Sequence, residues 1–116
     1  MEIDMSATGT GIFENELAQR IKAEFEAGMA AGQSVFIASD RLLEKYRDSD
    51  SVTVYLALAA LQVGHDVVQH KVKKRALTII NHSEGLDRWE DAGAETIAAR
   101  LQALQDLRLR LLEVFA

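Results

Sequence analysis

The sequence contains no cysteine and no proline among its 116 residues. Without cysteine, the chain can form neither disulfides nor metal sites with thiolate ligands. Proline is the residue that most strongly breaks helices, and an average chain contains about 5% of it. Its absence favours a few long helices joined by short turns, and it argues against a loop-rich enzyme scaffold.

Long apolar runs and an excess of positive charge are also absent. No run approaches the ~20 apolar residues that a membrane-spanning helix needs. The net charge of −5 argues against broad nucleic-acid binding, which depends on neutralising phosphates. Glu2 and Asp4 stand where a secretory signal would carry Lys or Arg, so we expect no signal peptide and a cytoplasmic location.

Sequence motifs of common active sites are missing as well. There is no glycine-rich phosphate loop, no nucleophile elbow and no His-Glu-x-x-His motif. We therefore expect no cofactor. No internal repeat of ~20 to 50 residues is visible, which argues against a solenoid.

Residues 50–82 form the most apolar part of the chain. Asp50 and Ser51 are residue types that cap helix N-termini. At 100° per residue, the apolar side chains that follow gather on two opposite faces, which indicates a helix buried from two sides. We interpret this stretch as the central helix of a bundle. Gly64 lies inside it and should destabilise the helix by about 1 kcal/mol relative to alanine.

The residues before this stretch predict a disordered N-terminal segment followed by an amphipathic helix. We expect residues 1–11 to be disordered and residues 12–116 to form a single helical domain. One helical phase continues through the following apolar positions: Leu17, Ile21, Phe25, Gly28, Gly32, Phe36, Leu43 and Tyr46. It favours one helix over residues 13–47, bent near 32–34. The alternative is two helices, with Ser34 capping the second.

Gly28 and Gly32 form a G-x-x-x-G pattern inside this helix. The spacing predicts a patch of small residues where another helix crosses closely. A hinge in the helix is the alternative interpretation.

The last third of the chain predicts a leucine-rich helix whose apolar side is wider than one seam. Such a helix is either clamped between neighbours or offers a surface to another chain. Arg108 falls inside the apolar stripe, either with its head extended to solvent or in a buried pair. The predicted interface residues are Leu101, Leu104, Leu107, Arg108, Leu111, Leu112 and Phe115.

Asp66 and His70 are the polar pair with the clearest chemical interpretation. They are four residues apart and would face each other on one helix, as a weak metal-binding pair or as an ion pair that raises the pKa of His70. A transition-metal site needs three or four ligands, and no further ligands are apparent, so we expect no metal. His70-Lys71-Val72-Lys73 resembles the H-x-[LV]-K core of histidine phosphotransfer domains, which are acidic helical bundles of similar size. The small residue of that family four positions after the histidine is Lys74 here.

A basic cluster and a lone tryptophan are the remaining candidates for a docking site. Lys71, Lys73, Lys74 and Arg75 would complement the dipole at the end of the central helix, or dock an acidic partner or nucleic acid. No aromatic residues for base stacking are interleaved with them, which weakens the nucleic-acid alternative. Trp89 would cover one end of the bundle or anchor a contact.

These features together predict an all-α antiparallel bundle of three long helices, with four as the alternative. The leading function is a non-enzymatic interaction module: a small acidic adaptor, chaperone or regulatory subunit that binds itself or a different protein. The alternative is a phosphotransfer or metal-using helical protein centred on His70 and Asp66.

Overall fold

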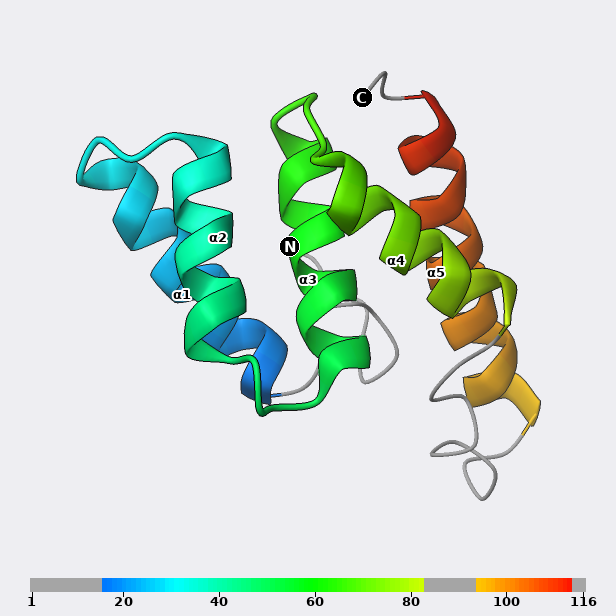
Figure 1. Ribbon diagram of the computed structural model, residues 1–116. Coiled ribbons are helices and arrows are strands. Elements are labelled where there is room, and N and C mark those ends of the chain that lie inside the picture. The colour runs from blue at the N-terminus through cyan, green and yellow to red at the C-terminus, as the bar shows by residue number, and fades with distance from the viewer. Residues whose placement is uncertain (1–15, 83–93, 114–116) are drawn as a thin grey trace, which may run out of the picture.

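The computed structural model describes residues 16–82 and 94–113, and all secondary structure in these ranges is helical (Figure 1). The helices are α1 (Glu16–Ala30), α2 (Val35–Lys45), α3 (Ser51–Gly64), α4 (His70–Asn81) and α5 (Ala94–Glu113). The predicted all-α class is therefore confirmed. The predicted number of three or four long helices is wrong, because five shorter helices occupy the described ranges.

The predicted helix over residues 13–47 is broken into α1 and α2 by the turn at 31–34. Gly32 has a φ of 98°, a conformation that glycine adopts without steric cost. Ser34 then caps α2, because its hydroxyl oxygen accepts a hydrogen bond from the Ile37 N–H at 3.1 Å. The two-helix alternative, with Ser34 as its cap, is thus confirmed.

The predicted helix over residues 50–82 is also broken, at residues 65–69. Asp66 takes a positive φ of 60°, which ends α3 shortly after Gly64. The side-chain oxygen of Gln62 accepts a hydrogen bond from the Gln69 N–H at 2.8 Å, which fixes the start of α4. The prediction of a single central helix is therefore wrong, and only its first half, α3, is central.

The helices form two stacked hairpins followed by α5. Helices α1, α3 and α5 pack side by side in chain order, while α2 contacts α1 and α3, and α4 contacts α3 and α5. Figure 1 shows α2 and α4 in front, with α1 and α5 behind them. Helices α2 and α4 begin at residues 35 and 70, an offset of 35 residues. The two hairpins stack on each other, and of the described helices only those of the second hairpin contact α5.

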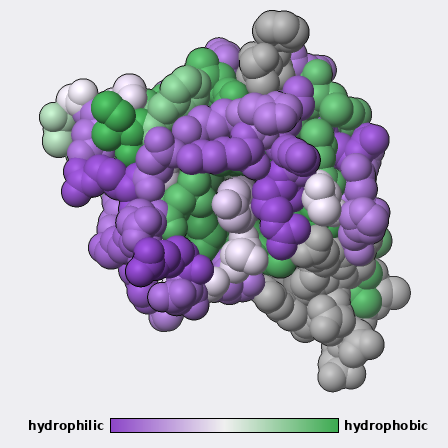
Figure 2. Space-filling model, viewed as in Figure 1, coloured by the Kyte–Doolittle hydropathy of each residue, from purple (hydrophilic) through white to green (hydrophobic). Residues whose placement is uncertain are grey.

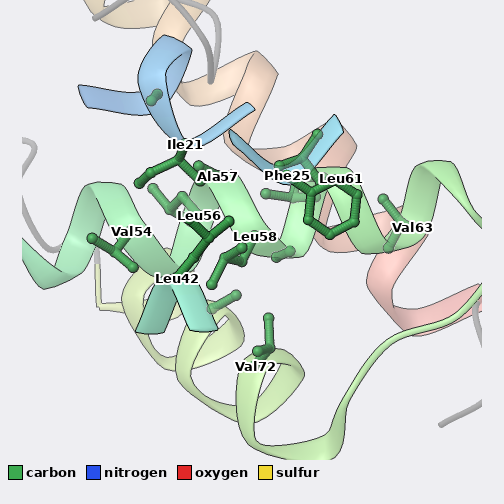
Figure 3. Packing of buried hydrophobic residues seen from close by; sticks show 14 of the residues in the cluster. Ile21, Phe25, Leu42, Val54, Leu56, Ala57, Leu58, Leu61, Val63 and Val72 are labelled. Atoms are coloured by element: carbon green, nitrogen blue, oxygen red, sulfur yellow. The ribbon is translucent and has the colours of Figure 1, made fainter. Parts of the chain in front are cut away.

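Helix α3 lies at the centre of the hydrophobic core. Figure 3 shows Ile21 and Phe25 of α1 on one side of α3, and Leu42 of α2 and Val72 of α4 on the other. Leu58 of α3 is fully buried between them. The prediction that this stretch is buried from two sides is confirmed for α3.

The close helix approach predicted at Gly28 is also present. A Cβ atom at Gly28 would lie 3.5 Å from the Cβ of Ala38 on α2 and 2.5 Å from the side-chain oxygen of Gln33. Gly32 serves the turn instead. None of the helices described by the structure is both long and apolar enough to cross a bilayer. Residues 1–11 lie outside the described residues, and the boundaries of the single domain stay a prediction.

Candidate functional site on the outer face of helix α5

The inner face of α5 holds this helix against the rest of the fold. Leu104, Leu107 and Leu111 are buried, with 4%, 5% and 0% of their surfaces exposed. They belong to the same core as α3 and α4, against which α5 packs. These three predicted interface residues are therefore used within the chain and are not accessible to a partner.

Two arginines of α5 bind the ends of the preceding helices. Arg110 donates a hydrogen bond from Nη2 to the carbonyl oxygen of Val63 at 3.2 Å, in the last turn of α3. The same carbonyl also accepts a hydrogen bond from the Asp66 N–H at 3.0 Å, and it lies at the negative end of the helix dipole. Arg108 donates from Nε to the side-chain oxygen of Asn81 at 3.1 Å, at the end of α4. Arg108 is half-buried and forms no ion pair with another residue that the structure describes.

The outer face of α5 carries an apolar ridge, which we define as Ala98, Leu101, Leu109 and Leu112. All four are exposed, the leucines by 42%, 50% and 52%. Gln105, also exposed, lies in the middle of the ridge. Of the predicted interface residues, Leu101 and Leu112 belong to this ridge, and Phe115 lies outside the described residues. The interface itself stays a prediction.

Sequence reasoning left Ala98, Gln105 and Leu109 out of the interface. The periodicity showed that α5 has more leucine than one seam requires, but it could not tell which leucines face the core. Leu109 could have been identified only by knowing that Leu104, Leu107 and Leu111 point inward.

The opposite end of the stack is polar. Exposed residues of α1 include Gln19, Lys22 and Glu26, and they surround the buried positions Ile21 and Phe25. Figure 2 shows that hydrophilic side chains also cover much of the face formed by α2 and α4, while hydrophilic and apolar side chains both appear at the right-hand edge, on the side of α5. The outer face of α5 is thus less polar than the other end of the stack.

A second exposed apolar pair is present at the start of α2. Phe36 and Ile37 are exposed by 47% and 54%. The prediction that Phe36 shares the apolar face of α1 is wrong. The turn at 31–34 reverses the chain and resets the phase, so that Ala38, Ser39 and Leu42 of α2 face the core instead.

A polar network connects α2, α3 and the start of α4. Buried Gln62 donates to the hydroxyl of buried Ser39 at 2.8 Å and to the side-chain oxygen of Gln69 at 3.0 Å. Gln69 donates to Asp40 at 3.1 Å, and Lys71 pairs with Asp40 at 2.8 Å. Lys71, and then Gln69, hold the pKa of Asp40 below its ordinary value of 3.8. All these contacts are internal, so the network serves the fold.

A groove of about 400 Å³ lies along α1 and α2, with Glu24, Arg41 and Lys45 among its lining residues. Glu24 accepts hydrogen bonds from Lys45 Nζ and from the Tyr46 hydroxyl. Lys45 and then Tyr46 lower the pKa of Glu24, and Glu24 raises the pKa of Lys45. Burial, followed by the bond to Glu24, raises the pKa of Tyr46. Glu24 thus ties α1 to the end of α2.

The pair of Glu24 and Lys45 predicts a loss of stability in acid. Because the pKa of Glu24 is lower in the fold than its ordinary value of 4.5, the carboxylate stabilises the fold fully above that pH. This contribution is lost as the pH falls through the lower pKa of the folded state. Denaturant unfolding at several pH values should show that Glu24→Gln is less stable than the native chain at pH 7 and that the difference shrinks below pH 4.5.

The matched control for losing one negative charge is Glu26→Gln, at an exposed position of the same helix. The difference in free energy of unfolding between Glu26→Gln and the native chain should not shrink as the pH falls. If Glu24→Gln and Glu26→Gln had the same pH dependence, the contact of Glu24 with Lys45 would contribute nothing to it.

The histidines and Asp66 do not form a common site. Asp66 lies in the turn after α3, and His70 is the first residue of α4, so the assumption that both lie on one helix is wrong. Both side chains are exposed. The ring of exposed His65 lies 5.7 Å from that of Phe25. Within residues 16–82 and 94–113, no cluster of three or more His, Asp or Glu side chains could hold a metal ion.

The basic cluster lies in the first half of α4, because this helix begins at His70. Its cations are therefore near the positive end of the helix dipole, and the prediction that they complement the negative end is wrong. Lys71 is paired with Asp40, Lys74 is exposed, and Arg75 is half-buried. Trp89 lies outside the described residues. A docking role for Lys74 and Arg75 stays a prediction.

No family model, no curated protein and no solved structure matches this chain. The geometry of the molecule therefore carries the functional argument by itself.

Proposed function

We propose that the chain is a non-enzymatic helical interaction module, which uses the apolar ridge of α5 to bind an apolar surface of another polypeptide. The adaptor, chaperone and regulatory-subunit roles expected from the sequence all require such a surface. A second copy of the chain is among its candidate partners, in agreement with the expected self-association. The cytoplasmic location stays a prediction.

The exposed ridge is the observation that supports this proposal. Stacked helical hairpins need a polar outer face at each end to stay soluble alone. Helix α1 has this character, whereas α5 exposes three leucines within three turns. Water does not favour such a cluster of apolar side chains, and contiguous apolar patches usually mark binding sites.

No specific observation favours the phosphotransfer or metal-using alternative. His70 is exposed at a helix start, but Asp66 is not aligned with it on the same helix. The contacts of the network around Asp40 and Gln62 join helices of the same chain. We therefore propose only the interaction function.

Light scattering on a sizing column tests the proposal through Leu112→Asp. The native chain should show a mass above that of one chain, rising with concentration, because burial of the ridge drives association. A charge at Leu112 would have to be desolvated in the interface, so the variant should run as a monomer or need at least tenfold more protein to associate.

Ile37→Asp is the matched control, because Ile37 is exposed by 54% and Leu112 by 52%. It adds the same charge at an equally exposed apolar position away from the ridge, and it should leave association unchanged. Both variants should keep the thermal midpoint of the native chain to within a few degrees. Association that is lost in Ile37→Asp and kept in Leu112→Asp would assign the interface to α2 and overturn the role of the ridge.

A further inference from the structure

The ridge of α5 has a symmetric arrangement around Gln105. Leu101 and Leu109 each lie four residues from Gln105, and Ala98 and Leu112 each lie seven residues from it. With a rise of 1.5 Å per residue, these pairs are about 6 Å and about 10 Å from Gln105 along the helix. At 100° per residue, all four side chains lie within about 40° of the direction of Gln105. The apolar positions therefore have the same spacing from either end of the ridge, with leucine in both inner positions and alanine and leucine in the outer ones.

We infer that the occupant of the ridge is a second copy of the chain, bound through an antiparallel pair of α5 helices whose two-fold axis passes by Gln105. This inference rests on the proposed function, since it names the partner of the same surface. A two-fold axis there places Leu101 opposite Leu109 of the partner copy, and Ala98 opposite Leu112 of the partner copy. Every apolar position then meets an apolar one, as an isologous interface requires.

Gln105 is suited to the position on the axis. A primary amide carries both donors and an acceptor, so two copies of Gln105 can form hydrogen bonds to each other. The central polar residue of the ridge therefore has a partner in the dimer. A partner that presented only apolar side chains would leave this amide buried without one.

The stacking of the hairpins agrees with this arrangement. Helices α1, α3 and α5 follow one another in one layer, and α5 is covered on its inner side by α3 and α4. An α5 helix from a second copy would cover the outer side. The two stacks would then meet end to end, with their polar α1 helices at the far ends.

Acidic charge lies on only one side of the ridge, whereas Arg108, bonded to Asn81, lies about 60° from Gln105 on the other side. Glu95, Asp106 and Glu113 are exposed and lie roughly 80° to 100° around the helix from Gln105, all in the same direction. In an antiparallel pair with two-fold symmetry, the acidic sides of both copies lie on the same side of the dimer. Their repulsion weakens the dimer, and salt screens it. Raising the salt concentration should therefore strengthen self-association, whereas it would weaken binding of a basic helix.

Cysteine cross-linking tests the arrangement, because the chain contains no other cysteine. Two helices packed ~9 Å apart bring facing Cα atoms on the axis to roughly 4.5 Å, at the near end of the range that a disulfide accepts. Gln105→Cys should thus form a disulfide-linked dimer under mild oxidation. Asp106→Cys is the matched control: its Cα atoms would be about 10 Å apart, and it should cross-link far more slowly.

Variants at the ends of the ridge distinguish antiparallel from parallel pairing. In the antiparallel pair, two copies of Leu112→Cys are about 20 Å apart and should not cross-link. A mixture of Leu101→Cys and Leu109→Cys chains should form mixed dimers more readily than either variant alone. A parallel pair places each residue opposite itself, so rapid cross-linking of Leu112→Cys with itself would overturn the antiparallel arrangement.

The outcomes separate this inference from the proposed function. Leu112→Asp could abolish association while Gln105→Cys cross-links no faster than Asp106→Cys. This combination would keep the ridge as an interface and overturn the two-fold axis at Gln105. A ridge of one helix is smaller than the ~800 Å² that each partner contributes to a standard interface, so micromolar or weaker association is expected. A single-chain mass up to ~1 mM protein, at low and at high salt, would overturn the second copy as the occupant.

Discussion

Replacing Leu58 by alanine should lower the free energy of unfolding by about 2–5 kcal/mol. Leu58 is fully buried in α3, between side chains of the neighbouring helices. The substitution removes apolar contacts and leaves a cavity that packed helices on both sides cannot easily close. A loss of this size is a large part of the stability of a typical domain, and it should lower the thermal midpoint by roughly 10 °C or more.

Chemical denaturation followed by circular dichroism measures this effect. The control is Leu109→Ala on the ridge, where half of the side chain is already exposed. It should change the free energy of unfolding by no more than about 0.5 kcal/mol at concentrations where the chain is monomeric. Equal losses for Leu58→Ala and Leu109→Ala would contradict the assignment of Leu58 to the core and of Leu109 to the surface.

Replacing Gln62 by leucine should cost about 2–4 kcal/mol, although leucine is apolar and of similar volume. Three groups lose the bond to Gln62 in this variant: the buried hydroxyl of Ser39, the main-chain N–H of Gln69 and the half-buried side-chain oxygen of Gln69. A buried polar group without a partner costs about 1–3 kcal/mol. The effect should appear in the same denaturation experiment as a lower midpoint with an unchanged slope.

A double-mutant cycle separates this effect from packing. Adding Ser39→Ala to Gln62→Leu removes the unpaired hydroxyl, so the double variant should be more stable than the sum of the two single changes predicts. Gln69→Ala is a milder control, because it keeps the main-chain bond to Gln62 and removes only a half-buried side chain. A cycle without coupling between Ser39 and Gln62 would show that the hydrogen bond between them contributes nothing.

Gln62 also explains why the sequence could not reveal where α4 begins. Gln69 is not a residue type that favours a helix N-terminus, and it makes no side-chain capping bond. Its N–H is bound instead by the side chain of Gln62, seven residues earlier in α3. Such a contact depends on tertiary structure, whereas capping rules consider only neighbouring residues. The break between α1 and α2 carries a local signal at Ser34, and the sequence therefore offered it as an alternative.

The centre of the fold could be predicted from the sequence because α3 is apolar on two faces. A helix of this kind must be buried from two sides, whatever its neighbours are. The site on α5 could be predicted from the sequence only in part. An excess of leucine showed that a second surface exists, but the choice between Leu104 and Leu101 as the inward residue depends on how α5 rests on α3 and α4, and no local pattern contains that information.

The order of the helices has a consequence for how the protein folds and opens. Each described helix contacts only described helices one or two places away along the chain, so no contact joins α1 or α2 to α5. Proteins with such local contacts fold quickly, in microseconds to milliseconds. They also open in parts rather than all at once, and an end element opens most easily. Helix α5 is such an element, and a partner seated on its outer face would therefore slow local unfolding at this end more than anywhere else.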